Sequence, residues 1–181
     1  MPTNPFPSRR QSPGLSILTN DDGSGGGELA FFGKGHVTFT KLAGKLSIND
    51  TPYTLENSIT GLAAAIQKNP SGAYAMAAGY DASRDGTYSK SPISPGLAGT
   101  FEGLGNVISN LAIVVPEETS GEDTALFALL SGTIRDFGVV HANISIIQVK
   151  YHREFTTPTA GLLVGDNLGT IARVHVRWTL V

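Results

Sequence analysis

The stretch Val107-Ile-Ser-Asn-Leu-Ala-Ile113 decides the fold prediction, because its skeleton occurs twice more in the chain. The second copy is Thr133-Ile-Arg-Asp-Phe-Gly-Val139, and the third is Thr170-Ile-Ala-Arg-Val-His-Val176. The copies start at residues 107, 133 and 170, so their starts lie 26 and 37 residues apart. Such a loose period falls near the lengths of units that stack on one another in repeat proteins.

The spacing inside the heptad indicates a bend. In a straight strand, Ile108 would lie on one face while Leu111 and Ile113 lie on the other, because side chains alternate along a strand. A bend at Asn110 lets all three point inward, and Asn or Asp at a corner tolerates the left-handed backbone conformation. Strand, corner, strand is typical of one coil of a right-handed parallel β-helix, which we expect from about residue 99. We expect Ile108, Ile134 and Ile171 to stack in its interior.

Chance is the alternative explanation for the three heptads. A chain rich in Gly, Ile and Val can contain several strand-like heptads that share no structural role. The residues around the heptads favour the repeat, since they also follow a recognisable pattern.

Two segments resemble repeats of one bacterial family. Gly99-Thr-Phe-Glu-Gly-Leu-Gly-Asn-Val-Ile-Ser-Asn-Leu-Ala-Ile113 resembles a Gly-Thr-Phe-Asp-Gly segment of the filamentous-haemagglutinin-like exoproteins. The stretch at 160–176 resembles the GLUG repeat of the same two-partner-secretion adhesins, and residues 53–83 resemble the helix segment that often precedes it. The matching GLUG positions are Gly161, Leu162, Val164, Gly165, Asn167, Gly169 and Ile171.

This resemblance covers residues 29–176 and implies a secreted, surface-associated right-handed β-helix, commonly a filamentous adhesin. Three positions depart from the family pattern: Ala160 replaces a Gly, Glu102 an Asp and Arg173 an Asn. These departures affect individual corners of the expected coils.

The rest of the chain divides by composition. Residues 1–20 are rich in Pro and polar side chains, so we expect a disordered leader. Residues 21–181 are expected to form a single β-helix domain, with N-terminal strands in 21–56, a helix in 57–69, irregular structure in 70–98 and repeat coils in 99–181. The expected N-terminal runs are Leu29–Phe32, His36–Phe39, Lys45–Ile48 and Pro52–Leu55, with a tight turn at Asn49-Asp50.

One segment has the periodicity of an amphipathic helix. Ile59, Leu62 and Ile66 recur at spacings of three, four and seven residues within 58–68. Asn57 or Ser58 can cap its start, and Pro70 ends it. We expect this short helix to pack its apolar face on the β portion.

Composition excludes several functional classes. The 13 Lys and Arg against 15 Asp and Glu give a net charge of -2, which provides no field to attract nucleic acid. The absence of Cys excludes disulfides, thiolate nucleophiles and the common structural zinc sites. No stretch is apolar enough for a signal peptide or for insertion into a membrane.

The location and ends of the molecule are expectations from the family and from coil capping. The resemblance implies an extracellular or bacterial cell-surface location, although no export signal is visible. The C-terminal residues 174–181 run straight out of the third repeat with no capping pattern. We therefore expect a fragment of a longer solenoid, with possible strand-edge self-association through the C-terminal coil.

Parallel β-helices also include polysaccharide lyases and glycoside hydrolases, which need carboxylates converging on one face. The candidates are Glu102, Asp136 and Asp166, with Arg135 or Arg173 as basic partners. Asp136 and Arg173 hold equivalent corner positions in two repeats, so we expect them to form a structural ion pair. An enzyme would instead show a groove with facing acidic residues and aromatic side chains, for which Tyr151 and Trp178 are available.

The sequence motifs of metal-binding and nucleotide-binding sites are incomplete or missing. The acidic run of Glu117, Glu118, Glu122 and Asp123 lacks the ligand spacing of a calcium loop. The histidines at 36, 141, 152 and 175 are scattered, and the His-Glu-x-x-His motif is missing. The Gly-rich run at 23–27 lacks the Lys-Ser/Thr of a phosphate loop.

The sequence therefore predicts no catalytic, cofactor-binding or metal-binding residue. The predicted function is a non-catalytic structural or adhesive β-helix segment of a secreted bacterial surface protein, not an enzyme. Its partners would be surface glycans or host or cell-surface proteins, without nucleic acid. The alternative is a carbohydrate-active β-helix enzyme, a polysaccharide lyase or a glycoside hydrolase.

Overall fold

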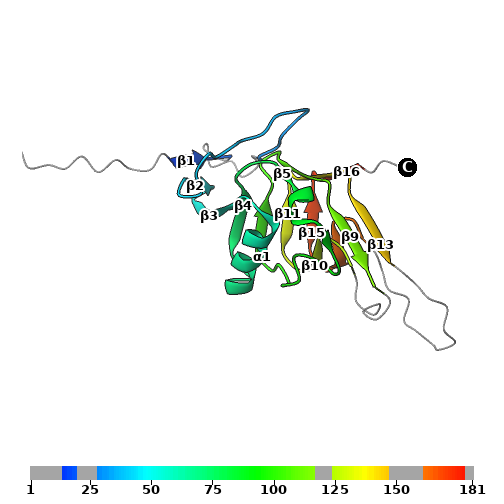
Figure 1. The fold of residues 1–181 in the computed structure, drawn as a ribbon. Coiled ribbons are helices and arrows are strands. Elements are labelled where there is room, and N and C mark those ends of the chain that lie inside the picture. Colours follow the sequence, from blue (N-terminus) through cyan, green and yellow to red (C-terminus); the bar gives the residue numbers. More distant parts are fainter. Residues whose placement is uncertain (1–13, 20–27, 117–123, 147–160, 178–181) are drawn as a thin grey trace, which may run out of the picture.

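The computed structural model describes residues 14–19, 28–116, 124–146 and 161–177 (Figure 1). Strands dominate this part of the chain, with one α-helix, α1 (Ile59–Lys68), and one short 3-10 helix, η1 (Ala82–Asp85). The predicted all-β class with one helix is confirmed. The strands are β1 (Gly14–Ile17), β2 (Lys45–Ile48), β3 (Thr51–Glu56), β4 (Ala73–Met76), β5 (Tyr80–Asp81), β6 (Thr87–Tyr88), β7 (Thr100–Glu102), β8 (Val107–Ser109), β9 (Ala112–Val115), β10 (Phe127–Leu130), β11 (Thr133–Arg135), β12 (Gly138–Val140), β13 (Asn143–Ile146), β14 (Val164–Asn167), β15 (Thr170–Ala172) and β16 (His175–Arg177).

Strands β1 to β4 lie in one sheet, but from β4 onward consecutive strands lie in different sheets, and the chain returns to each sheet in turn. One such circuit of the sheets is called a pass below. The largest sheet has the order β1-β2-β3-β4-β7-β11-β15, and the others are β16-β12-β8-β5, β13-β9-β6 and β10-β14. Each of β7 to β10 pairs in parallel with the strand four places later, β11 to β14. Among the described strands, only β2 and β3 pair antiparallel. Figure 1 shows β4, β11 and β15 following one another across the largest sheet.

The predicted corners at the fourth position of the heptad are confirmed. Asn110, Asp136 and Arg173 all have left-handed backbone conformations, with φ of 57°, 52° and 51°. Each follows a three-residue strand and precedes the next strand by one residue. Because of this bend, Ile108, Leu111 and Ile113 are all completely buried, as the spacing predicts.

The expected stack of three isoleucines is wrong for Ile108. Ile134 pairs with Ile171 on one side, but with Phe101 on the other, and Ile108 instead pairs with Val139. The chain makes a left-handed corner both after β11 and after β12, where His141 has a φ of 54°. The heptad therefore marks a local bend that occurs at two corners of the pass from β11 to β14. The similarity of the heptads aligned the corner after β8 with the corner after β11, although these join different pairs of sheets.

Ile171 also departs from the prediction of a buried interior position. Ile171 is 39% exposed, whereas Ile134 is completely buried between two neighbouring strands. Ile171 lies on β15, the last strand of the largest sheet in the described part of the chain. One side of this residue therefore has no strand over it.

Helix α1 matches its prediction in position, cap and buried face. Ser58 caps the start, and its hydroxyl accepts a hydrogen bond from the backbone N–H of Gly61. Ile59, Leu62 and Ile66 are the buried residues of the helix. They join the main apolar cluster with Tyr74 and Phe101, so the helix packs on the β portion.

Residues 70–98 are more regular than predicted. They contain β4, β5, η1 and β6, and the three strands pair with β7, β8 and β9 of the following pass. Two of these strands have only two residues each, too short to produce a visible alternation. This segment therefore forms the first pass of the same pattern that the heptads reveal later.

The N-terminal predictions are confirmed in part. Lys45–Ile48 and residues 52–55 lie in the hairpin of β2 and β3, and Asn49 and Asp50 form its turn with φ of 48° and 62°. The runs expected at 29–32 and 36–39 are not strands, because they lie outside the sheet ladders. The expected leader 1–20 is wrong for 14–17, which forms β1 and pairs with β2. Residues 1–13 and 20 lie outside the described part.

Two apolar clusters lie on opposite faces of the largest sheet. On β4, Tyr74 and Met76 contribute to the main cluster, whereas Ala75 contributes to a second cluster with Leu46 and Leu104. The alternation of side chains along the strand places these sets on opposite faces. The main cluster also contains Phe101, Phe127 and Phe137 in mutual ring contact through Phe101.

Candidate functional site

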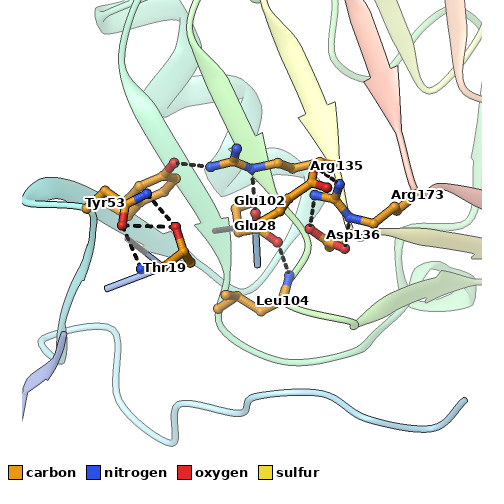
Figure 2. A network of polar contacts seen from close by, with 9 residues as sticks. Thr19, Glu28, Tyr53, Glu102, Leu104, Arg135, Asp136 and Arg173 are labelled. Atoms are coloured by element: carbon orange, nitrogen blue, oxygen red, sulfur yellow. Dashed lines mark hydrogen bonds and ion pairs between the residues drawn. The ribbon is translucent and has the colours of Figure 1, made fainter. Parts of the chain in front are cut away.

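The structure brings together four of the five residues considered for catalysis. Glu102 ends β7 and Arg135 ends β11, the neighbouring strand of the largest sheet. Asp136 follows directly at the corner, and Arg173 holds the same corner of the next pass. Figure 2 shows the four side chains as two neighbouring ion pairs, Arg135 with Glu102 and Arg173 with Asp136, which, with their hydrogen-bond partners, are called the network below. Asp166 lies apart on β14 and is exposed.

Glu102 is completely buried and uses both carboxylate oxygens. Oε1 accepts a hydrogen bond from the backbone N–H of Leu104 at 3.0 Å, and Oε2 accepts one from Nε of Arg135 at 2.8 Å. Nη2 of Arg135 donates to the hydroxyl of Tyr53 at 3.0 Å. The network thus connects β3, β7 and β11 across the same sheet.

The predicted ion pair of Asp136 and Arg173 is confirmed. Nε of Arg173 lies 2.7 Å from Oδ1 of Asp136, and Nη2 lies 2.8 Å from Oδ2. Two parallel hydrogen bonds of this kind give geometric specificity as well as attraction. Nη1 of Arg173 also donates to Glu28, so the corner is bound to a segment far away in the sequence.

Burial and charge pairing act in opposite directions in this network. Burial raises the pKa of Glu102 to about 6, and nearby Asp136 adds to this, whereas the Leu104 N–H and Arg135 oppose it. The hydrogen bonds to Asp136 raise the pKa of Arg173 above its usual range. The arginines compensate two buried carboxylates that would otherwise be costly to keep charged.

This arrangement suits a structural role, in which the two ion pairs hold neighbouring strands together. Glu102 and Asp136 lie at one corner on adjacent passes, as the enzyme alternative requires, and Glu102 is completely buried while Asp136 is 3% exposed. All four carboxylate oxygens accept hydrogen bonds from arginine or backbone N–H groups. A general acid or base must face the substrate, and these carboxylates face neighbouring strands.

The segment 28–40, called the strap below, lies against this corner. The backbone N–H groups of Val37 and Phe39 donate to the carbonyls of Leu104 and Ala77 at 2.9 and 2.6 Å. Nδ2 of Asn106 donates to the carbonyl of Val37 at 2.8 Å. The strap also runs so close to Gly105 that a Cβ atom there would overlap the carbonyl oxygen of Gly35.

Sequence reasoning missed two members of the network and a second acidic centre. Tyr53 and Glu28 lie far from the repeats in sequence, so no spacing indicates their contacts. Around η1, Asp85 accepts hydrogen bonds from the hydroxyls of Tyr80 and Tyr88, both at 2.6 Å. The hydrogen bond to Asp85, with burial, raises the pKa of Tyr80 to about 12. These residues meet at a tight turn, so their spacing in the sequence has no period that would predict the cluster.

A groove of about 520 Å³ lies between α1 and the strands β3 and β4. None of the four network residues above lines it. Its wall contains two charged side chains, Glu56 and Lys68, and several small residues. The lining residues are Pro52, Thr54, Glu56, Gly61, Ala64, Ala65, Lys68, Asn69, Gly72, Ala73 and Tyr74.

The remaining candidates do not assemble into a site in the described residues. His36 lies on the strap, His141 at a corner and His175 on β16. Across the described ranges, no group of three or more His, Cys, Asp or Glu side chains could hold a metal ion. Those ranges exclude His152, Tyr151, Trp178 and the acidic residues Glu117, Glu118, Glu122 and Asp123.

Within the portion that the structure describes, no helix has the length and apolar character needed to cross a membrane. Comparison with known proteins found no match to a family model, a curated protein or a solved structure.

Proposed function

We propose that this chain is a right-handed parallel β-helix segment with a structural and adhesive function. The observation that carries the proposal is the parallel pairing of successive passes through left-handed corners. Each pass from β7 to β10 is followed by a pass from β11 to β14 in matching register. Repetition of this kind makes an extended, rigid surface, which suits a molecule that presents binding faces away from a cell.

The ion-pair network supports a non-catalytic function. Arg135 and Arg173 engage the candidate carboxylates Glu102 and Asp136, which belong to the interior of the corner. A lyase or glycosidase needs a pair of such groups beside a space that admits a sugar chain. The groove beside α1 has one acidic side chain, Glu56, in its lining.

The resemblance of residues 29–176 to filamentous-haemagglutinin-like exoproteins with GLUG repeats supports the biological setting. Under this proposal the protein belongs to a secreted bacterial surface structure. Its partners are surface glycans or cell-surface proteins. Among the described strands, β15 and β16 are edge strands of their sheets, which suits strand-edge self-association under this proposal.

Incubation of the purified chain with neutral and acidic polysaccharides tests this function. New reducing ends and unsaturated products would report turnover, and retention on immobilised glycans or on whole cells would report adhesion. We expect retention without turnover. Turnover that disappears in Glu102→Gln or Asp136→Asn would contradict the proposal and favour the carbohydrate-active enzyme.

A further inference from the structure

The groove beside α1 is built from two walls with different origins. On β3, Thr54 and Glu56 are in register with Tyr74 and Met76 of β4, so they lie on the face of the sheet that α1 covers. On the helix, Ala64 and Lys68 face them across the groove. The helix thus covers β4 and the main cluster, while β3 extends beyond it and forms the open wall.

Small residues keep this groove open. A Cβ atom at Gly61 would overlap Oε2 of Glu56, so the glycine gives the carboxylate its place over the first turn of the helix. The hydroxyl of Tyr74 donates to the carbonyl of Ala65 at 2.9 Å and also contacts the carbonyl of Asn69. The hydroxyl of Tyr74 is therefore already engaged by backbone carbonyls at the C-terminal end of α1.

The lining combines apolar and polar groups without net charge. Glu56 and Lys68 have opposite charges, and burial raises the pKa of Glu56 while Lys68 opposes that rise. The Thr54 hydroxyl provides a donor and an acceptor, while Pro52 and Ala64 present apolar surface. A strongly charged ligand would therefore meet an unfavourable partner at one end or the other.

The backbone around the groove restricts the ligand further. Strand β3 pairs with β2 through Thr51–Tyr53 and with β4 through Thr54–Glu56, so every residue of β3 already has a strand partner along one edge. A purely apolar ligand would leave Thr54, Glu56 and Lys68 without polar partners. A ligand with many hydroxyl groups and apolar C–H faces satisfies both parts of the lining. The groove volume of about 520 Å³ lies within the usual range of small-molecule sites.

We propose that the groove between α1 and β3 binds a short neutral oligosaccharide, an inference that rests on the adhesive function proposed above. Glu56 accepts hydrogen bonds from sugar hydroxyls, and Lys68 donates to them. Ala64 and Pro52 provide the apolar surface against which the sugar C–H groups pack.

Isothermal titration calorimetry of the full chain with neutral, acidic and basic trisaccharides tests this inference. We expect a neutral trisaccharide to bind more tightly than either charged one. Ala64→Tyr should fill the groove and weaken this binding at least tenfold. The matched control is Gln67→Tyr, at another exposed position of α1 that does not line the groove, and it should leave the affinity unchanged. Equal melting temperatures of the two variants would show that both remain folded.

A second variant tests the charge balance. Glu56→Gln leaves Lys68 as the charged side chain of the groove lining, so the variant should gain affinity for the acidic trisaccharide. Neutral binding that persists in Ala64→Tyr would overturn the groove assignment and leave the adhesive function standing. Adhesion to cells without any binding of a neutral trisaccharide would also overturn the groove alone, whereas loss of both would count against the adhesive function as well.

Discussion

Helix α1 and the strap cover opposite faces of the largest sheet, and they are held there in different ways. The helix places Ile59, Leu62 and Ile66 in the main cluster, with Leu62 and Ile66 completely buried. The strap, residues 28–40, has no buried residue, and Phe32 within it is 84% exposed. The helix is therefore anchored by buried side chains. The strap is held by backbone hydrogen bonds, by the ion pair of Glu28 and by partly buried side chains that pack on the second cluster: Leu29, Phe31, Val37 and Phe39.

Because of this difference in burial, the strap should open before the helix. The strap is tied by the carbonyls of Leu104 and Ala77, by Asn106 and by the ion pair of Glu28 with Arg173. Segments with few buried apolar contacts open at lower free energy than the global unfolding of the protein. We expect the strap to open locally while α1 unfolds only with the core.

The largest loss of stability is expected from a substitution in helix α1. Leu62→Ala removes a completely buried side chain and should lower the free energy of unfolding by about 3 kcal/mol. Denaturant titration measures this change, with the exposed Gln67→Ala as the control. An effect below about 1 kcal/mol would show that α1 contributes little to the core.

The next effect comes from Glu102, which holds the turn beneath the strap. Its pKa in the folded protein is raised to about 6 from 4.5, so the folded state binds a proton more tightly than the unfolded state. The resulting stabilisation is fully present below about pH 4.5 and is lost as the pH rises through about 6. The shift corresponds to about 2 kcal/mol between these limits.

Glu102→Gln removes the titrating group and should flatten this part of the pH profile. Denaturant titrations of both proteins between pH 4.5 and 7.5 measure the difference. A variant that retains the slope of the parent chain would assign the pH dependence to another group.

A smaller effect is expected on the strap itself. Asn106→Ala removes the hydrogen bonds from Nδ2 to the carbonyls of Val37 and Gly103. The loss should cost about 1–2 kcal/mol and should speed amide exchange at Val37 and Phe39 more than at Ile134. Uniform acceleration at all three amides would show that the strap does not open separately.

The smallest effect is expected from the strap side chains. Val37→Ala trims a partly buried side chain and should cost less than about 1 kcal/mol. Thermal denaturation compared with Leu62→Ala sharpens the contrast between the two covers. Equal losses of stability would remove the distinction between a helix anchored by completely buried side chains and a strap whose side chains are only partly buried.

The sequence was most informative where side chains repeat with a period. The helix was predictable from Ile59, Leu62 and Ile66, because one helical face must be apolar to be buried. The corners were predictable from the bend that unites Ile108, Leu111 and Ile113. The pair of Asp136 and Arg173 followed from their equivalent corner positions.

The rest depends on contacts between distant segments. The register of Ile108 could not be read from the heptad, because the same bend occurs at two corners of one pass, at Asp136 and at His141. The strands β5 and β6 are too short for a period, and the strap looks like a strand although it lies outside the sheet ladders. Tyr53 and Glu28 reach the network through folding alone, so their sequence positions give no signal.

Successive passes stack in parallel, with Thr133 of β11 beside Thr100 of β7. Because the chain has no Cys, the double variant Thr100→Cys/Thr133→Cys tests this register without competing thiols. Neighbouring strands lie about 4.8 Å apart, within the Cα range that a disulfide can span. We predict that this pair oxidises to an intramolecular disulfide, whereas Val107→Cys/Thr133→Cys, the pair that alignment of the heptads would place together, stays reduced. Oxidation of the second pair without the first would contradict the account.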